Sequence, residues 1–286
     1  MSPESDSRLE QVWVNGNPEH EVSPFDRALH FGDGLFETIA CRRGRPRFLG
    51  LHLERLRLGC TRLGIDPGAL EIIATEVRAL AGEVESVLVK VLLTRGTALA
   101  RGYAATGGEK ATRVTFRYAW PGETRSESQD GVRVRTATLR LGENPALAGL
   151  KHCNRLEQIL ARREWTDPAI AEALLFSSSG KLVSGTMSNV FIVEGSVLRT
   201  PRMDLCGVAG VMRRVVLREA ARLGIAARED VLGVEDLQRA SEVFLTNARI
   251  GIWPVRALDA RSLPCGSVTR KLQEVLAPLL EEPVDA

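Results

Sequence analysis

The residues best suited to covalent chemistry in this chain are its lysines, and they are scarce. Of 38 basic residues in the 286-residue sequence, only five are lysine: Lys90, Lys110, Lys151, Lys181 and Lys271. A lysine amine, unlike a guanidinium, can lose its proton and attack a carbonyl carbon. Four of the five have ordinary solvated positions. Lys151 instead lies between an apolar strand end and a predicted helix, where burial would lower the pKa of its amine.

Two further segments are suited to an anion. The segment GVAGVMR at residues 207–213 is a glycine-bearing loop that enters a helix, whose first amides and dipole favour a phosphate. Residues 52–56 place Arg55 among apolar neighbours on a predicted helix. Taken singly, these features also fit a structural lysine, an ordinary turn and a surface salt bridge. Together, a Schiff-base lysine and a phosphate cradle are what pyridoxal phosphate (PLP) requires.

Composition excludes several classes of protein. The formal net charge is +2 and 44% of residues are hydrophobic, so the chain is globular, and its charge gives no reason to expect nucleic acid or an anionic membrane. No apolar run is long enough for a transmembrane helix, and the polar first ten residues do not resemble a signal peptide. The five cysteines are scattered without a CxxC pair, which favours free thiols in the cytoplasm and no metal site.

The elements that must position these residues are mixed in both halves of the chain. Predicted strands are residues 11–14, 35–41, 85–95, 112–120, 132–139, 171–177, 181–183, 188–193, 196–200 and 242–247. Predicted helices are residues 49–64, 66–80, 154–165, 211–223 and 267–280. The sequence therefore predicts a two-domain α/β (α+β mixed) protein. Its smaller N-terminal domain spans 1–121, a polar linker spans 122–131, and the larger C-terminal domain at 132–286 carries the cofactor lysine.

In order along the chain, these motifs resemble the fold-type IV PLP enzymes, the family of D-amino-acid and branched-chain aminotransferases and of aminodeoxychorismate lyase. The matching segments cover nearly the whole chain: 26–38, 52–56, 151–154, 184–191, 207–213 and 242–255. Within the family, residues 101–103, 140–158 and 246–255 look most like the aminodeoxychorismate lyases. The resemblance implies a D-amino-acid aminotransferase-like fold and a cytoplasmic homodimer that acts on a small molecule.

The resemblance also implies a cofactor site, position by position. Lys151 matches the lysine that holds PLP as a Schiff base and moves the proton. Arg55 matches the arginine on the cofactor phosphate. Val211 and Met212 match the helix-start amides on the same phosphate, and Ala248 matches a further phosphate contact.

Three residues are implied nearer to the substrate. Thr38 matches a lyase threonine that assists proton transfer near the lysine. Arg101 matches an arginine expected at a substrate carboxylate, for which the rigid guanidinium fork is suited. Asn247 is expected as a polar group near the substrate or the cofactor.

Ser184 departs from the family pattern, which has a glutamate at this position. A glutamate keeps the pyridine nitrogen protonated, whereas a hydroxyl can bond that nitrogen but cannot hold its proton by charge. The resemblance implies a lyase that forms para-aminobenzoate and pyruvate, with an aromatic product whose formation makes a weaker electron sink tolerable. Two alternatives stay open: an aminotransferase on the same fold, and a PLP-binding protein with little turnover.

Overall fold

The computed structural model describes residues 7–98, 101–122 and 125–281. Residues 1–6 of the polar first ten, and residues 123–124 of the predicted linker, therefore lie outside the described residues. The chain divides into two compact units, which we treat separately. Among the described residues, the N-terminal unit comprises 7–98, 101–121, 150–154 and 281, and the C-terminal unit comprises 122, 125–149 and 155–280.

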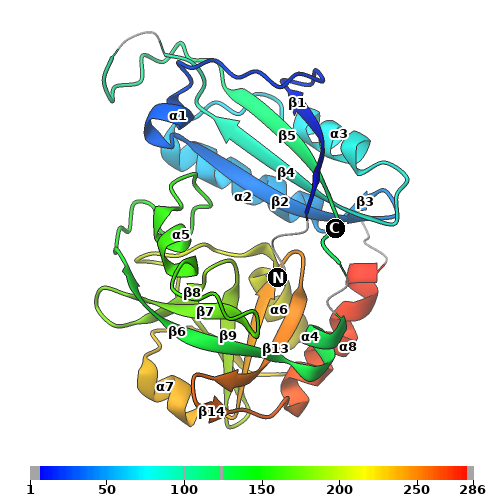
Figure 1. The fold of residues 1–286 in the computed structure, drawn as a ribbon, viewed down its shortest axis with the longest axis vertical. Helices are drawn as coiled ribbons and strands as arrows, with labels where there is room; N and C mark the ends of the chain where they lie inside the picture. Colours follow the sequence, from blue (N-terminus) through cyan, green and yellow to red (C-terminus); the bar gives the residue numbers. More distant parts are fainter. Residues whose placement is uncertain (1–6, 99–100, 123–124, 282–286) are drawn as a thin grey trace. The chain divides into compact units, whose positions relative to one another are not determined.

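The N-terminal unit is built on an antiparallel sheet in the order β1-β5-β4-β2-β3 (Figure 1). Its strands are β1 (Leu9–Val14), β2 (Gly34–Arg42), β3 (Arg45–Pro46), β4 (Ser86–Thr94) and β5 (Thr112–Ala119). Its helices are α1 (Arg27–Phe31), α2 (Leu49–Leu63) and α3 (Leu70–Ala81).

Helix α2 lies unusually close to β2, and a glycine makes this approach feasible. The helix buries residues at helical spacing, among them His52, Leu56 and Gly59. A Cβ atom added to Gly59 would come within 2.7 Å of the Leu35 side chain on β2. Because any larger residue would push the helix outward, the contact fixes the distance between α2 and the strand that precedes the site.

The C-terminal unit is built on a mixed sheet in the order β11-β10-β9-β12-β13-β6-β7-β8, with β14 paired to β13. Its strands are β6 (Val132–Leu141), β7 (Ile170–Ser177), β8 (Leu182–Gly185), β9 (Asn189–Glu194), β10 (Val197–Pro201), β11 (Ala227–Asp230), β12 (Glu242–Asn247), β13 (Gly251–Leu258) and β14 (Arg261–Ser262). Its helices are α4 (Arg125–Asp130), α5 (Leu156–Arg162), α6 (Val211–Arg222), α7 (Val234–Arg239) and α8 (Ser267–Glu281).

Both faces of this sheet are buried. Val190 and Ile192 of β9 join a core cluster around Trp253. Phe191, between them, points to the opposite face, as strand alternation requires, and stacks on Phe244 of β12 with the ring centroids 4.9 Å apart. Helix α6 contacts β12 and buries its own apolar residues. The strands therefore read as continuous apolar runs in sequence.

The mixed α/β fold class is confirmed, but some elements differ from the prediction. The predicted linker contains the short helix α4, which contacts β13. Residues 150–154 group with the N-terminal unit, although the predicted C-terminal domain includes them. The predicted domain bounds stay a prediction. Strand β13 is not among the predicted strands, and it includes Pro254, which lacks the amide that a central strand needs.

The stacked aromatic pair gives a prediction for stability. F191A removes a fully buried ring from the C-terminal unit and should lower the free energy of unfolding by about 3–5 kcal/mol. The measurement is a urea titration followed by tryptophan fluorescence. V231A, at a half-exposed position of the same unit, should change the free energy by less than about 0.5 kcal/mol. Equal effects of the two variants would contradict this account of the core.

Candidate active site

A buried carboxylate organises one end of the N-terminal unit. Glu37 of β2 is only 2% exposed, and its side chain meets His52 and Arg55, which lie one turn apart on α2. The Arg55 guanidinium donates from Nε to Glu37 Oε1 at 2.8 Å and from Nη2 to Oε2 at 2.5 Å, and His52 Nδ1 lies 2.6 Å from Oε2. Arg55 is thereby held by a bidentate pair, the geometry for which arginine is suited.

The charges in this cluster are fixed by their surroundings. Burial alone would raise the pKa of Glu37, but the Arg55 charge and the His52 hydrogen bond lower it to about 2. Burial lowers the pKa of His52, and this outweighs the neighbouring carboxylate. His52 is therefore neutral, with Nδ1 donating to Glu37. Its Nε2 is buried and has no hydrogen-bond partner among the described residues.

Lys151 lies beside β2 in the same unit. The Phe36 amide donates to the Lys151 carbonyl at 2.9 Å, and the Cys153 amide donates to the Gly34 carbonyl at 2.9 Å. Lys151 Nζ lies 4.1 Å from the centroid of the Phe36 ring, within the distance range of a cation–π contact. The lysine is partly exposed. These main-chain bonds fix where the side chain starts, and the ring offers its amine an apolar surface.

Thr38 is the next residue on the Phe36 face of β2, because side chains alternate along a strand. It pairs with Lys90 on β4. The Lys90 ammonium lies 5.3 Å from the Phe36 ring centroid and 5.8 Å from that of Phe116. Lys90, taken from sequence as a solvated mid-strand lysine, is thus a second cation on the ring that Lys151 contacts. The signal that could have found it is its place in an otherwise apolar strand.

The C-terminal unit carries a separate cradle at the start of α6. The Gly149 amide donates to the Gly207 carbonyl, and the Ala209 amide donates to the Gly149 carbonyl, both at 3.0 Å. The N-cap of α6 is Gly210, with no side-chain cap and no acidic residue in the first turn. The first helix amides, including those of Val211 and Met212, therefore favour an anion.

Glycine is required at this cap. A Cβ atom on Gly210 would lie 1.9 Å from Asn189 Oδ1, whose amide nitrogen donates to the Val208 carbonyl at 2.9 Å. The glycine therefore lets the loop close onto β9 while the helix start is left without a side-chain cap. This is the arrangement expected where a ligand anion, and not a protein carboxylate, approaches the amides.

Ser184 is buried at the end of β8, and its hydroxyl donates to the Gly185 carbonyl at 2.8 Å. The buried carboxylate of Glu172 lies near Ser184 in the fold and accepts hydrogen bonds from the turn that follows it. It accepts from the Thr186 and Met187 amides and the Ser188 hydroxyl at 3.0–3.1 Å, and it also bonds the Thr186 hydroxyl. Burial raises the pKa of Glu172 in spite of these donors. Glu172 therefore fixes the turn that follows Ser184.

Asn247 ends β12 and closes the turn to β13. Its side-chain oxygen accepts from the Arg249 amide at 2.9 Å and from the Ile250 amide at 3.0 Å, and its nitrogen donates to the Met187 carbonyl at 3.2 Å. Ala248 lies within this turn. Asn247 therefore joins the loop after β12 to the turn after Ser184, a structural task that the sequence did not indicate.

The predicted site residues fall into two groups. Lys151, Thr38, Arg55 and Arg101 belong to the N-terminal unit, where Lys151 and Thr38 share the β2 face and Arg101 lies in an exposed loop. The C-terminal unit holds the other predicted residues, which are Ser184, Val211, Met212, Asn247 and Ala248. Glu37 and Lys90 were missed in sequence, and both take their importance from neighbours distant along the chain.

The N-terminal unit thus carries a lysine beside a strand, and the C-terminal unit carries a helix start whose amides favour an anion. The chain matches the family described as "Amino-transferase class IV" over residues 34–258. This covers most of the sequence, so the chain belongs to the class IV aminotransferase family.

Individual relatives within this family include aminodeoxychorismate lyases and branched-chain aminotransferases. An aminodeoxychorismate lyase of Vibrio harveyi is 33% identical over 91% of this chain and 97% of its own length. The crystal structure of 4-amino-4-deoxychorismate lyase from Pseudomonas aeruginosa is 43% identical, with a TM-score of 0.90 over 94% of this chain and 99% of that one. A T.th. branched-chain amino acid aminotransferase with pyridoxamine 5'-phosphate is 25% identical, with a TM-score of 0.83 over 96% of each chain. The expected resemblance to the lyases of this family is confirmed.

Metal-binding clusters and membrane-spanning helices are both absent from the described residues. Within residues 7–98, 101–122 and 125–281, histidine, cysteine and carboxylate side chains form no group suited to a metal ion. In the same ranges, the helices are too short or too polar to cross a membrane.

The Glu37 cluster gives a prediction for stability against pH. Because the pKa of Glu37 is about 2 in the folded protein against 4.5 ordinarily, its ionised form stabilises the fold above pH 4.5, and this contribution is lost as the pH falls toward 2. E37Q should lower the free energy of unfolding at neutral pH by about 3–5 kcal/mol, because it leaves Arg55 without its buried partner. Urea titrations at a series of pH values measure both effects.

The control for this prediction is E85Q, which removes an exposed carboxylate paired with Arg42 and Arg43. Its unfolding profile should follow the wild type over the same pH range. If E37Q also lost stability in parallel with the wild type on acidification, Glu37 would not be the group responsible.

Proposed function

We propose that this chain is a PLP-dependent carbon–oxygen lyase that converts aminodeoxychorismate to para-aminobenzoate, a folate precursor, and pyruvate. The observation that carries the proposal is the similarity to aminodeoxychorismate lyases at 33% and 43% identity over more than nine-tenths of the chain. The contact of Lys151 with the Phe36 ring supports it, because it provides an amine on an apolar surface, and Thr38 lies on the same face of β2 as Phe36.

The residues present fit PLP. The family resemblance assigns Lys151 to its aldehyde carbon and Arg55, which Glu37 orients, to its phosphate. It assigns the first amides of α6, at Val211 and Met212, to the phosphate as well. Ala248 would supply a further phosphate contact, and Ser184 would face the pyridine nitrogen. The start of α6, where Gly210 provides no side-chain cap and the first turn has no acidic residue, supports this assignment.

When bound, PLP supplies an electron-withdrawing ring that makes the carbon bearing the substrate amine more acidic. Lys151 would take the proton from that carbon and return a proton to the departing enolpyruvyl group, which leaves as pyruvate. Thr38 lies on the same strand face and would assist this transfer. Arg101 would bind a substrate carboxylate, and Asn247 would keep the adjoining turns in place. The ring of the other product becomes aromatic, and no second keto acid is consumed.

Ser184 favours the lyase over an aminotransferase. Transamination forms no aromatic product and therefore depends more strongly on a protonated pyridine ring, which a hydroxyl cannot enforce by charge. An elimination that ends in an aromatic ring has a larger driving force of its own. The lyase is accordingly the better match to a chain with serine at this position, and the third alternative, cofactor binding with little turnover, predicts a yellow protein without product.

The proposal includes a cytoplasmic homodimer. The dimer follows from the family, and the cytoplasmic location is supported by the five cysteines, all of which are free thiols. The enzyme then has two kinds of partner, its small-molecule substrate and a second copy of the chain.

The first prediction of the proposal concerns Lys151. K151A should abolish the visible absorbance of the PLP-loaded protein and slow para-aminobenzoate formation about a thousandfold or more, because it removes both the covalent link and the proton carrier. Absorption spectra and product assays measure the two losses. K181A, at an exposed lysine of the C-terminal unit, should retain both properties. A borohydride-reducible PLP adduct in K151A would assign the link to another lysine.

The second prediction concerns the cofactor ring. S184E should raise the rate of transamination between D-alanine or L-leucine and 2-oxoglutarate by about tenfold, because a carboxylate would hold the proton on the pyridine nitrogen. S184A is the matched control and should give no increase. Rates are compared per PLP bound. An S184E protein with wild-type transamination would show that ring protonation does not limit this reaction.

A further inference from the structure

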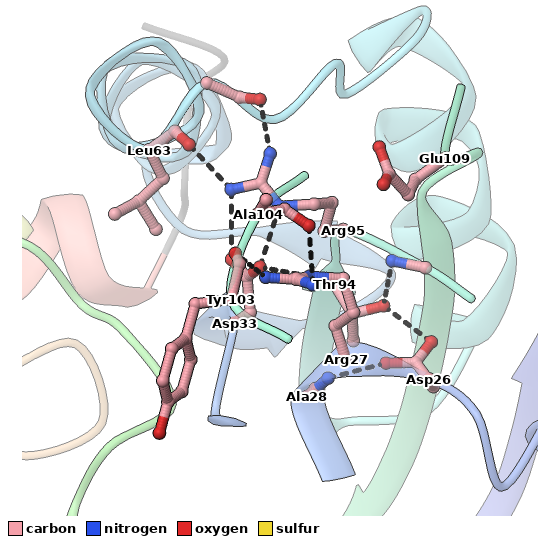
Figure 2. A network of polar contacts seen from close by, with 12 residues as sticks. Asp26, Arg27, Ala28, Asp33, Leu63, Thr94, Arg95, Tyr103, Ala104 and Glu109 are labelled. Carbon is pink, nitrogen blue, oxygen red and sulfur yellow. Dashed lines mark hydrogen bonds and ion pairs between the residues drawn. The ribbon is translucent and has the colours of Figure 1, made fainter. Parts of the chain in front are cut away.

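Arg27 occupies an uncommon position at the start of α1. It is only 5% exposed, and its guanidinium donates to three consecutive main-chain carbonyls of one loop (Figure 2). Nη2 donates to the Tyr103 carbonyl at 2.8 Å, and Nη1 reaches the carbonyls of Gly102 at 3.3 Å and Ala104 at 3.4 Å. Nε donates to Asp33 at 2.8 Å. One buried side chain thus contacts a loop that is distant along the chain.

The base of this arrangement is itself fixed. Asp33 is shared by Arg27 and Arg95, whose Nε lies 2.7 Å from it. Arg95 also donates to the Leu63 and Gly64 carbonyls at the end of α2. Burial alone would raise the pKa of Asp33, but the two arginines lower it, so the carboxylate stays charged. Arg27 is therefore attached to the same helix that carries Arg55.

The neighbouring Asp26 holds the main chain of Arg27 in place. Its carboxylate accepts from the Ala28 amide at 2.9 Å and from the Thr94 hydroxyl at 2.8 Å, and the Arg27 amide donates to the Gly96 carbonyl at 2.9 Å. Both ends of the Arg27 residue, main chain and guanidinium, are consequently immobilised.

The loop does not need these bonds for solvation. Gly102, Tyr103 and Ala104 are exposed, and Tyr103 is 85% exposed, so water could satisfy their carbonyls. Burying the Arg27 guanidinium with its counter-ion costs free energy, although the loop carbonyls that it binds could form hydrogen bonds with water instead. What the contact does achieve is to fix one conformation of a loop that has no helix or strand of its own, with Gly102 in the positive-φ region at 121°.

Only an arginine can do this. The planar fork carries donors in several directions, whereas a lysine ammonium is a compact charge that cannot span three successive carbonyls and a carboxylate. The ring of Phe31 lies 5.0 Å from the guanidinium carbon and 5.3 Å from the Tyr103 ring, which adds an aromatic contact at the same place.

We propose that Arg27 is a positioning residue that fixes the loop at residues 101–104, so that Arg101 is presented in one conformation to a carboxylate of the substrate. The inference rests on the proposed function for its substrate, and on the contacts above for the loop. Arg27 touches neither substrate nor cofactor in this proposal and acts through Arg101.

The test is the R27K variant of the PLP-loaded enzyme, with the full chain. The KM for aminodeoxychorismate should rise about tenfold, the factor that corresponds to the loss of one charge-assisted hydrogen bond, while kcat stays within about threefold of the wild type. The visible absorbance of bound PLP should be unchanged. R113K is the matched control, since Arg113 is a partly buried arginine paired with Glu76 in the same unit, and it should leave KM unchanged.

A double variant separates positioning from general stability. If Arg27 acts through Arg101, the KM of R27K/R101M should equal that of R101M alone, because the loop then carries nothing to position. Additive effects of the two substitutions would overturn the proposal. An unchanged KM in R27K would also overturn it. So would a lower kcat together with a higher KM and less bound PLP, because that pattern would mark a merely structural arginine.

A second measurement does not depend on the reaction. Trypsin can cut after Arg101, and Lys110 in an exposed position provides an internal reference. R27K should raise cleavage after Arg101 about tenfold relative to cleavage after Lys110, as expected when the loop loses its fixed conformation. If the wild type formed no para-aminobenzoate, the proposed function would fail, while this measurement would still decide whether Arg27 holds the loop. An unchanged cleavage ratio would overturn the inference.

Discussion

The arrangement of the N-terminal unit depends on one buried carboxylate. Glu37 lies where β2 faces α2, and it neutralises the charge of Arg55 while it selects the proton position on His52. A buried carboxylate is unfavourable unless it is paired and hydrogen-bonded, and here both conditions are met within one turn of helix. The close approach of α2 at Gly59 is part of the same design, because the ion pair can form only if the helix and the strand are this near. The role proposed for Arg55 on a phosphate calls for a rigid guanidinium, and the bidentate pair with Glu37 supplies that rigidity.

The sequence predicts those features of this protein that depend on residues close together in the chain, and it does not predict those that depend on residues far apart. The scarcity of lysine singled out Lys151, and the helix after Gly210 could be seen from local residues, since both signals are short-range. Most strands and helices were also predicted, because their apolar periodicity is local. Strand β13 was not, since its pairing with β12 and β6 overrides the unfavourable Pro254. Glu37, Lys90 and Arg27 gain their meaning only from partners that folding brings to them, which no spacing in the sequence reveals.

Two buried acidic residues, one in each unit, contrast in what surrounds them. Glu37 faces a guanidinium and an imidazole and is strongly acidic, whereas Glu172 faces amides and hydroxyls and has a raised pKa. Glu172 therefore serves as an acceptor that shapes the turn between β8 and β9, and Asn247 fastens that turn from β12. With Glu172 engaged in this way, the hydroxyl of Ser184 is the group that the chain offers at the position where the family resemblance implies a carboxylate. The chemistry favoured here is one whose product is stabilised by its own aromaticity.

The main chain around Lys151 carries hydrogen bonds on both sides of the residue, through Gly149 toward Gly207 and through the Lys151 carbonyl and Cys153 amide toward β2. Peptide groups held in this way cannot shift without breaking several bonds at once. The terminal nitrogen can therefore change place only by rotation about the bonds of its own flexible stem. The positions that this nitrogen can reach are set by the length of the lysine side chain. Any atom that exchanges a proton with the nitrogen must therefore come within that distance of the fixed main chain.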